Sequence, residues 1–342
     1  MGTRSRRVSV NWARSKLDKW DDFRMEIITN PTQDKIKKAA KALKDGHLVA
    51  FPTETVYGLG ADATNETAIS RIYSTKGRPS DHPLIVHIAS MAMIKKWAIE
   101  VPDYAIKLAK EFWPGPMTLI LKKSNLAKNF ITGGQNNIGL RIPSNQVAIS
   151  LLSEFEKLNG YGIAAPSANL YGAVSPTSFS DVIMEIGDKL AEKDIVIDGQ
   201  LCEIGIESTI IDCLSAVPKI IRPGFVTSEM IMEKIKLKHC LVNPNTKIKH
   251  SGQNNSHYAP RAKVVINANP KPRDGFIALS KVPSPKDSVR LASPKNIEEF
   301  ARILYSAYRK ADLLSLDRIL VILPEGNGLA VAVRERIEKS AR

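Results

Sequence analysis

Apolar and polar positions alternate in regular blocks along most of the chain. Between Asp34 and Lys44 the apolar residues recur with the spacing of one helix face, and Gly46 follows as a stop signal. The next block, residues 48–51, is a short apolar run closed by Pro52, which is typical of a buried strand. Because these two patterns keep alternating, the sequence predicts an α/β fold with one dominant sheet.

The same reasoning extends to further elements. Strands are predicted at residues 84–88, 117–121, 138–141, 162–165, 195–197 and 209–211, and helices at 67–74, 103–112, 147–158 and 181–191. Residues 240–260 are rich in Asn, Pro, Lys and Ser and lack any period, which is typical of a linker. A smaller alternating series follows, with strands at 263–266, 275–280 and 319–323 and helices at 296–311 and 329–341. This series predicts a small Rossmann-like α/β domain.

The predicted organisation therefore has four parts. A basic extension (1–24), which carries seven Lys and Arg residues against three Asp, precedes a large α/β domain (25–236). A linker (237–261) then leads to the small α/β domain (262–342).

Charge and cysteine usage narrow the class of protein. A net charge of +14 favours an anionic partner such as phosphate or nucleic acid, although a lysine-rich surface would produce the same number. No apolar run approaches the roughly 20 residues of a membrane helix, and the basic start lacks the apolar core of a secretory signal. Three cysteines without a CxxC pair predict reduced thiols in a cytoplasmic protein with no membrane association.

Two segments suggest contacts with phosphate. Residues 52–60 run from a strand end into hydroxyls, a carboxylate and two glycines, which is typical of a ligand crevice, although a tight turn reads the same way. Lys76 and Arg78 are spaced by Gly77, so both cations can turn toward one polyanion. An isolated segment of this kind is more often a solvated turn.

Other polar residues stand inside or at the ends of apolar strands. His87 lies in the run 84–88, where a hydrogen-bonded core histidine is the commoner role. Arg141 ends a buried strand and needs an anion or a salt bridge there. Ser167 and Asn169 follow another strand and offer a neutral cradle for phosphate oxygens.

Several site classes are absent from the sequence. There is no GxxxxGK[ST], which excludes a P-loop nucleotide site, and no GxSxG elbow. No zinc-ligand spacing occurs, so we predict no protein-held metal site.

Taken in order, the motifs resemble the YrdC-like threonylcarbamoyl-AMP synthases in their longer, two-domain form. The blocks that carry the resemblance are residues 52–60, 76–79, 83–87, 112–119, 141–143, 166–169, 175–177, 207–209 and 222–224, with a thinner match at 257–260 and 328–330. The resemblance implies a YrdC-like twisted mixed sheet with helices. It also implies condensation of L-threonine, bicarbonate or CO2, and ATP into threonylcarbamoyl-AMP with release of pyrophosphate, for the N6-threonylcarbamoyladenosine modification of tRNA.

The resemblance also assigns roles by position. Threonine would be held by Thr53, His87, Arg141, Ala165 and Ser208. ATP would be held by Lys76, Arg78, Asn137, Ser167, Asn169, Ser175 and Arg222, with Tyr258 as a cap. Lys76 and Arg78 would assist departure of pyrophosphate together with Mg2+, which the resemblance implies as the companion of ATP. Contact with tRNA or with a tRNA-modifying transferase is a further expectation.

One part of the linker departs from the family pattern. A Gly-Met-Lys-Tyr stretch normally precedes the His-Tyr-Ala-Pro motif and closes over the site, whereas this chain has Gly252-Gln253-Asn254-Asn255. Two other functions remain open at this stage. A pure RNA-binding module would fit the charge but lacks a stacking surface. The related carbamoyl-adenylate-forming maturation enzymes carry zinc-finger cysteine pairs, which this chain lacks.

Overall fold

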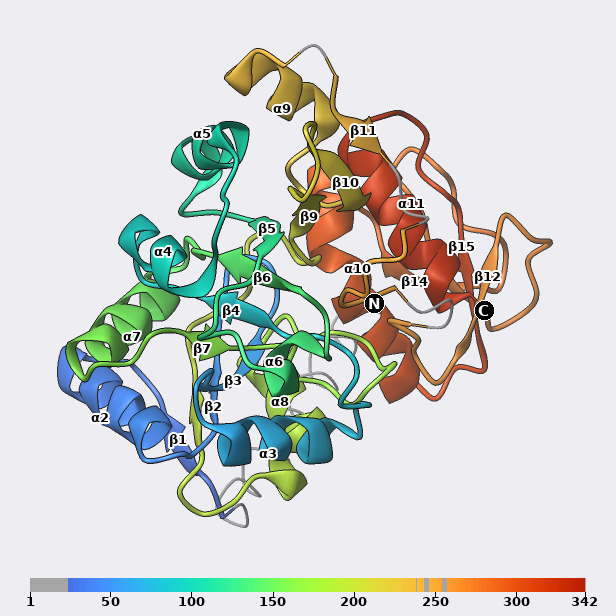
Figure 1. Cartoon of the computed structure of the whole chain (residues 1–342). Coiled ribbons are helices and arrows are strands. Elements are labelled where there is room, and N and C mark those ends of the chain that lie inside the picture. The colour runs from blue at the N-terminus through green and yellow to red at the C-terminus, as the bar shows by residue number, and fades with distance from the viewer. Residues whose placement is uncertain (1–23, 238, 243–245, 254–256, 342) are drawn as a thin grey trace.

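The computed structural model describes residues 24–237, 239–242, 246–253 and 257–341. Two sheets organise them (Figure 1). We call residues 24–242 the large unit and residues 262–341 the small unit. Most of the predicted basic extension, and Asn254 and Asn255 of the linker, lie outside the described residues.

The large unit is built on a mixed sheet of eleven strands in the order β1-β8-β2-β3-β7-β4-β6-β5-β9-β10-β11. In chain order the strands are β1 (Glu26–Ile28), β2 (Val49–Phe51), β3 (Gly58–Asp62), β4 (Ile85–His87), β5 (Met117–Lys122), β6 (Asn137–Arg141), β7 (Ile163–Ala164), β8 (Ile195–Ile197), β9 (Thr209–Asp212), β10 (Lys219–Arg222) and β11 (Leu241–Val242). Parallel pairs such as β4 with β6 stand beside antiparallel pairs such as β5 with β6. The predicted mixed α/β sheet is thus confirmed.

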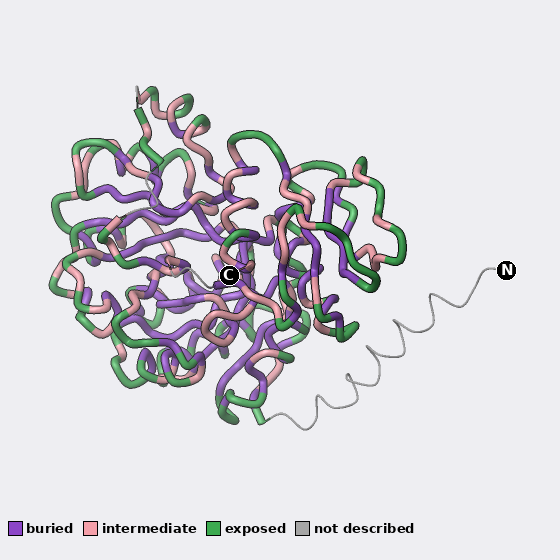
Figure 2. The backbone as a smooth tube through the Cα atoms, turned by 90° about the vertical axis from the view of Figure 1, so that its right-hand side faces the viewer, coloured by how far each residue is buried: buried purple, intermediate pink, exposed green. Residues whose placement is uncertain are grey.

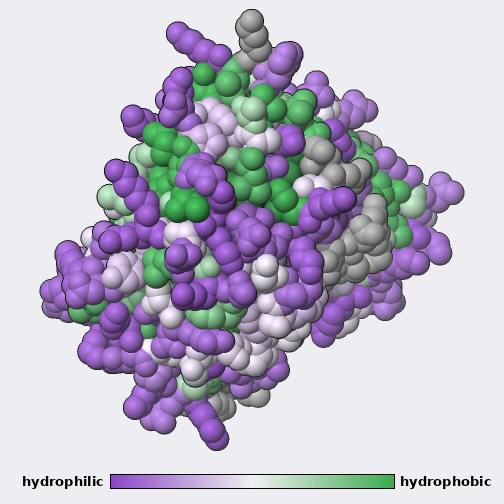
Figure 3. Space-filling model, viewed as in Figure 1, coloured by the Kyte–Doolittle hydropathy of each residue, from purple (hydrophilic) through white to green (hydrophobic). Residues whose placement is uncertain are grey.

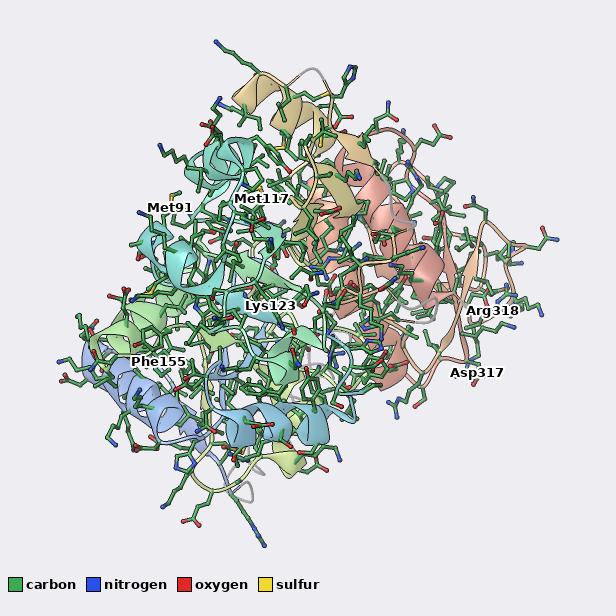
Figure 4. The ribbon with its side chains drawn as sticks, in the orientation of Figure 1. Met91, Met117, Lys123, Phe155, Asp317 and Arg318 are labelled. Atoms are coloured by element: carbon green, nitrogen blue, oxygen red, sulfur yellow. The ribbon has the colours of Figure 1, made fainter. Side chains whose placement is uncertain are left out.

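Helices cover this sheet. They are α2 (Gln33–Lys44), α3 (Glu66–Lys76), α4 (Ile94–Trp97), α5 (Asp103–Phe112), α6 (Asn129–Thr132), α7 (Gln146–Lys157), α8 (Phe179–Ile186) and α9 (Ser228–Ile235), with 3-10 turns at Met91–Met93 and Gly187–Lys189. Helices α2 and α7 lie side by side on one flank (Figure 1). They bury Leu43 and Phe155 in one apolar cluster, and Figure 4 labels Phe155 where α7 adjoins α2. The apolar spacing of residues 34–44 therefore correctly predicted the face of α2 that packs against the rest of the large unit.

The small unit has a four-stranded sheet whose pairs are all parallel, in the order β12-β15-β13-β14. Its elements are β12 (Lys263–Ile266), β13 (Gly275–Ile277), β14 (Val289–Ala292), α10 (Ile297–Leu313), β15 (Arg318–Val321) and α11 (Leu329–Ser340). The α/β character is as predicted, while the Rossmann-like classification stays a prediction. Figure 4 places Asp317 and Arg318 on the outer margin of this unit, and Met117 nearer the middle of the molecule.

The two units share one apolar core. Val56, Val174 and Ile206 of the large unit pack in the same cluster as Leu304 and Ile337 of the small unit. The buried backbone in Figure 2 accordingly runs through the centre of the molecule, and exposed segments form its margin. On the face shown in Figure 3, apolar surface gathers over α5 and α9, and most of the remaining surface is polar. No helix in the described ranges is long and apolar enough to span a membrane.

Strands β1, β10 and β14 were not predicted, and three further details of the sequence-based elements are wrong. Residues 52–60 are not all irregular, because Gly58 begins β3, which pairs antiparallel with β2. The helix expected at 181–191 is α8, which starts earlier at a capping box between Ser178 and Asp181 and ends at Ile186. The stretch read as linker contains β11, which adds a parallel strand beside β10. Each miss involves backbone pairing or capping, which apolar spacing does not report.

Candidate active site

A cleft lies where the ends of several central strands meet the junction of the two units, and its volume is about 50 Å³. It is lined by nine of the residues assigned from the resemblance: Thr53, Arg78, His87, Arg141, Ala165, Ser167, Ser208, Arg222 and Tyr258. These residues are scattered over more than 200 positions of the chain. The fold therefore brings most of the expected site together.

The other four assigned residues do not line the cleft. Lys76, Asn169 and Ser175 are buried behind its wall. Asn137 is the first residue of β6, at the opposite end of the strand from Arg141. It pairs with Lys122 of the neighbouring strand β5. The assignment of all thirteen residues to threonine or ATP stays a prediction.

Local geometry explains how Lys76 and Arg78 are aimed. Helix α3 begins at Asn65, whose side chain accepts a hydrogen bond from the Ala68 amide, and it ends at Gly77. Gly77 has a φ of +61°, a left-handed conformation that glycine adopts without strain and that terminates the helix. Lys76 is thus held in the last turn, and Arg78 leaves in a new direction.

Lys76 braces the loop after β7. Its ammonium donates to the carbonyl of Ser167 at 2.5 Å and to the carbonyl of Asn169. Burial lowers the pKa of Lys76 well below its usual range, and the charge of Arg78 lowers it further. The residue therefore shapes the Ser167–Asn169 cradle from behind.

Arg78 meets neutral groups only, as far as the structure describes its surroundings. Its guanidinium donates to the Pro83 carbonyl at 3.0 Å and approaches the Ser251 hydroxyl at 3.4 Å. It also lies 5.8 Å from the centroid of the Tyr171 ring. Its buried Nε has no hydrogen-bond acceptor among the described atoms. An arginine buried with neutral partners keeps its full charge for an incoming anion.

Arg222 has the same character. Its Nε and one terminal nitrogen donate to the Ser208 carbonyl at 3.0 and 2.9 Å. That nitrogen also reaches the Ser208 hydroxyl at 3.1 Å, and the other donates to the Ser251 carbonyl at 2.9 Å. The described residues offer it no carboxylate within ion-pair distance. Two arginines from distant strands and loops thus converge on one segment.

Arg141 differs, because it has an acidic partner. It donates to the Glu54 carboxylate at 2.6 Å, to the Thr55 hydroxyl at 3.0 Å and to the Gly115 carbonyl at 3.2 Å. The structural salt bridge considered for this residue therefore exists. Only three of its five N–H donors are used, so two remain for a carboxylate ligand in the cleft.

Hydroxyl groups and a neutral imidazole complete this side. Thr53 donates to the Val56 carbonyl at 2.6 Å, and the Ser208 and Thr118 hydroxyls lie 2.8 Å apart. Burial, aided by the charge of Arg141, lowers the pKa of His87 to about 3, so its ring is neutral at pH 7. Its Nδ1 has no partner within the described part of the chain. Such a nitrogen is available to a polar ligand.

Residues 250–253, which we call the closing segment, border the cleft. Ser251 and Gly252 line the cleft, and a side chain at Gly252 would meet the Tyr258 hydroxyl at 2.1 Å. Gly252 also has a φ of +79°, so two independent constraints require glycine there. Tyr258 is fully buried and stacks on Tyr305 of α10 with ring centroids 5.7 Å apart.

Sequence reasoning missed the acidic and small-unit members of the site. Glu207 lines the cleft and accepts hydrogen bonds from Ser175 at 2.6 Å and Tyr305 at 3.0 Å. Arg336 of α11 donates to it at 2.8 Å. The Glu-Ser-Thr block around residue 207 was a signal for the carboxylate. Nothing local marked Arg336 or Tyr305, which reach the site only through the fold.

The charge balance of the cleft favours anions. Among its described lining residues three arginines face one carboxylate, Glu207. Burial raises the pKa of Glu207, but Arg336 and Arg222 outweigh it and hold the pKa at about 2. No group of three His, Cys, Asp or Glu side chains suited to a metal ion occurs in the described ranges. A metal here would have to be held mainly by a ligand's own oxygens.

Comparison with known families supports the resemblance that the sequence motifs indicated. Residues 41–224 match the Sua5/YciO/YrdC family model described as "Telomere recombination". Residues 226–342 match the model described as "Threonylcarbamoyl-AMP synthase, C-terminal domain". Together the two models span both units.

Similar proteins cover nearly the whole chain. The threonylcarbamoyl-AMP synthase of Pyrococcus abyssi is 38% identical over 90% of this chain and 94% of its own length. That of Bacillus subtilis is 35% identical over 95% of this chain and 98% of its own length. The crystal structure of P. abyssi Sua5 complexed with L-threonine superposes with a TM-score of 0.82 at 36% identity, covering 93% of this chain and 97% of the other.

Proposed function

Because the chain belongs to the threonylcarbamoyl-AMP synthase family, we propose that it condenses L-threonine, bicarbonate or CO2, and ATP into threonylcarbamoyl-AMP and releases pyrophosphate. The observation that carries the proposal is the pair Arg78 and Arg222. They converge on one cleft with neutral partners only among the described residues. A polyphosphate provides the charge that such a pair requires.

Threonine occupies the side of the cleft formed by Arg141, Thr53 and Ser208. The two unused donors of Arg141 pair with the amino-acid carboxylate. The neutral His87 ring, with its unpartnered Nδ1, and the backbone of Ala165 complete this pocket. The complex of the related P. abyssi protein with L-threonine supports this proposal.

ATP occupies the opposite side. Arg78 and Arg222 bind its phosphates, and Ser167 contributes its hydroxyl, while Lys76 and Asn169 hold the cradle in shape from behind. Ser175, hydrogen-bonded to Glu207, steadies the wall beside the phosphates. Tyr258 caps the nucleotide. Asn137, at the far end of β6, is the remaining residue that we assign to ATP.

The reaction then needs positioning more than a strong base. The threonine amine forms a C–N bond to CO2 and loses a proton, which gives a carbamate. A carbamate oxygen attacks the α-phosphorus, the bond to the β-phosphate oxygen breaks, and pyrophosphate leaves with that electron pair. Arg78 and Arg222 offset the repulsion between carbamate and triphosphate and stabilise the charge on the departing group.

Mg2+ is the expected companion of ATP. It usually keeps several waters and binds through substrate phosphates, with one or two carboxylates at most. The single carboxylate in the described cleft lining, Glu207, is already engaged by Arg336, Tyr305 and Ser175, which fits a phosphate-held ion. When bound there, the ion would neutralise part of the phosphate charge.

The product carries an activated acyl group, so a transfer reaction must consume it. We propose the N6-amine of a tRNA adenosine as the acceptor. Direct contact with tRNA, or with the transferase that uses the product, is part of this proposal.

An omission experiment tests the function. The purified protein is incubated with 14C-bicarbonate, ATP, L-threonine and MgCl2, and labelled threonylcarbamoyl-AMP and pyrophosphate are measured. We expect both products only when all components are present. Pyrophosphate release that needs no threonine, or label in any other product, would overturn the proposal.

A further inference from the structure

Helix α11 of the small unit reaches the cleft through one buried arginine. Arg336 is completely buried and donates from Nε to the carboxylate of Glu207 at 2.8 Å, across 129 residues of sequence. It also donates to the Pro223 carbonyl at 3.1 Å and to Glu335. Its guanidinium lies 5.3 Å from the centroid of the Tyr258 ring. One side chain thus contacts the cleft wall, the β10 loop and the tyrosine cap.

Glu207 is the point where this contact enters the site. One of its oxygens accepts from Ser175, and Tyr305 donates at 3.0 Å to the oxygen that Arg336 also binds. Glu207 precedes Ser208, whose carbonyl and hydroxyl hold Arg222. The carboxylate is therefore adjacent to groups on both substrate sides.

An acidic residue at this place poses an electrostatic problem. A buried carboxylate without a cation would repel the phosphates of ATP and would draw Arg222 away from them, because charges interact strongly in a poorly solvated site. Arg222 is not itself within ion-pair distance of Glu207 in the described contacts. Arg336 is, and it comes from the other unit.

We propose that Arg336 is a positioning residue that neutralises Glu207, so that Ser175 stays fixed and the phosphate side of the cleft accepts ATP. The inference deepens the proposed function and rests on it. It assigns the small unit a part in nucleotide binding that acts through Glu207.

A second contact ties the same helix to the closing segment. Lys339, one turn beyond Glu335, donates to the carbonyl of Gly252 in the closing segment and to Glu335 at 2.6 Å. Glu335 in turn accepts from Arg336. Helix α11 therefore holds the wall and the closing segment through one connected set of charges.

The test is a charge cycle. Wild type, Arg336→Met, Glu207→Gln and the double variant are compared by calorimetry for ATP and for L-threonine, with thermal melting to establish folding. We expect Arg336→Met to weaken ATP binding at least about tenfold and to change threonine binding much less. The double variant, which removes both charges, should recover most of the lost ATP affinity. Because affinities are compared on protein that thermal melting shows to be folded, a loss and recovery confined to ATP reports the charge beside the phosphates, whereas a purely structural bridge would change melting and both affinities together.

Two further variants keep the test decisive. Arg336→Lys retains the charge and should bind ATP within about threefold of wild type, so it replaces the Met variant as the readout if that protein does not fold. Arg318→Met removes an arginine paired with Asp274 in the same unit, away from the cleft, and is the matched control for ATP binding. Equal weakening of ATP and threonine by Arg336→Met, or a double variant that binds ATP no better than the single, would overturn the proposal.

Binding and turnover separate the two proposals. If wild type binds ATP but forms no threonylcarbamoyl-AMP, the proposed function fails, and the binding cycle still decides the role of Arg336. If wild type is active and the cycle fails, only the role of Arg336 is overturned.

Discussion

The buried arginines of the two units differ in what they face. In the large unit, Arg78 and Arg222 donate to carbonyls and hydroxyls and have no acidic partner among the described residues. In the small unit, Arg336 is bound to Glu207 and Arg309 to Glu185, at 2.8 and 2.9 Å. A buried cation without a counter-charge is costly, so it persists where a ligand brings the missing charge. Among these four arginines, the two that line the cleft are the two without an acidic partner.

Arg141 stands between these two cases. It lines the cleft like Arg222 but is paired with Glu54 like Arg336. Its partners occupy three of the five N–H donors of the guanidinium, which leaves two without a described partner. An arginine of the cleft can thus be paired with a carboxylate and still keep donors for a ligand.

Acid should separate the two units most strongly. Burial lowers the pKa of His87 in the large unit and of His257 in the segment between the units to about 3, and that of His250 in the same segment to about 4, whereas the small unit has no histidine. These depressed values mean that the unfolded chain binds more protons than the folded one. The stabilisation is complete above pH 6.5 and is lost as the pH falls toward 4. Near pH 5 all three histidines are protonated in the unfolded chain and neutral in the folded one, so the free energy of unfolding should drop by about 4 kcal/mol per pH unit.

Hydrogen exchange at pH 7.5 and pH 5, converted to opening free energies, measures this loss segment by segment. We expect strands β4 and β6 and the closing segment to lose protection first. Equal loss in α10 and β15 would contradict the assignment of the acid sensitivity to the cleft.

Breaking the Arg141 pair should affect stability and binding separately. Arg141→Gln leaves Glu54 buried without its cation, and we expect the free energy of unfolding to fall by about 3–5 kcal/mol in urea titrations. Glu54→Gln combined with Arg141→Gln should restore most of that stability. Threonine affinity should stay low in both variants, and its recovery in the double variant would show that Arg141 does not bind the ligand.

Removing an unpaired arginine should affect catalysis instead. Arg222→Met is expected to lower kcat/KM for ATP by about 100-fold or more, because a charged donor to the departing group is lost. Pyrophosphate release measures the change. Arg71→Met, which removes an arginine paired with Asp194 in the same unit, should leave kcat/KM close to wild type. Similar losses in both variants would erase the distinction between paired and unpaired arginines.

The smallest effect is expected at the outer margin of the small unit. Arg318→Met removes a partly exposed ion pair with Asp274, so the free energy of unfolding should fall by about 1 kcal/mol or less. Urea titration measures this change. A large loss of stability would mean that the peripheral pair is as important as the Arg336 pair.

Much of the fold could be predicted because local spacing carried it. Helix α5 was expected at residues 103–112 and spans Asp103–Phe112, and strand β8 was expected at 195–197 and spans Ile195–Ile197. Strand β3 was missed because its Gly58-Leu59-Gly60 segment lacks an apolar run, and it is a strand only through its pairing with β2 and β7. Backbone pairing with a distant partner leaves no periodic trace in one segment.

The site residues likewise fall into those that the sequence could predict and those that it could not. The order of motifs along the chain was enough to nominate Arg78, Arg141 and Arg222, since Arg141 and Arg222 each end a strand and Arg78 follows the end of a helix. Lys76 was nominated as a cleft residue, but its ammonium is turned to the loop carbonyls behind the wall. Side-chain direction depends on neighbours that spacing does not identify.

The sequence by itself determined the α/β alternation, the arginines proposed for phosphate and the family, because each is encoded within a short stretch of chain. Only the tertiary structure decided which charges are compensated. Arg141 meets Glu54 across 87 residues, and Arg336 meets Glu207 across 129. Electrostatic pairing depends on the distance between two charges in space. For residues that are remote in the sequence, only folding sets that distance.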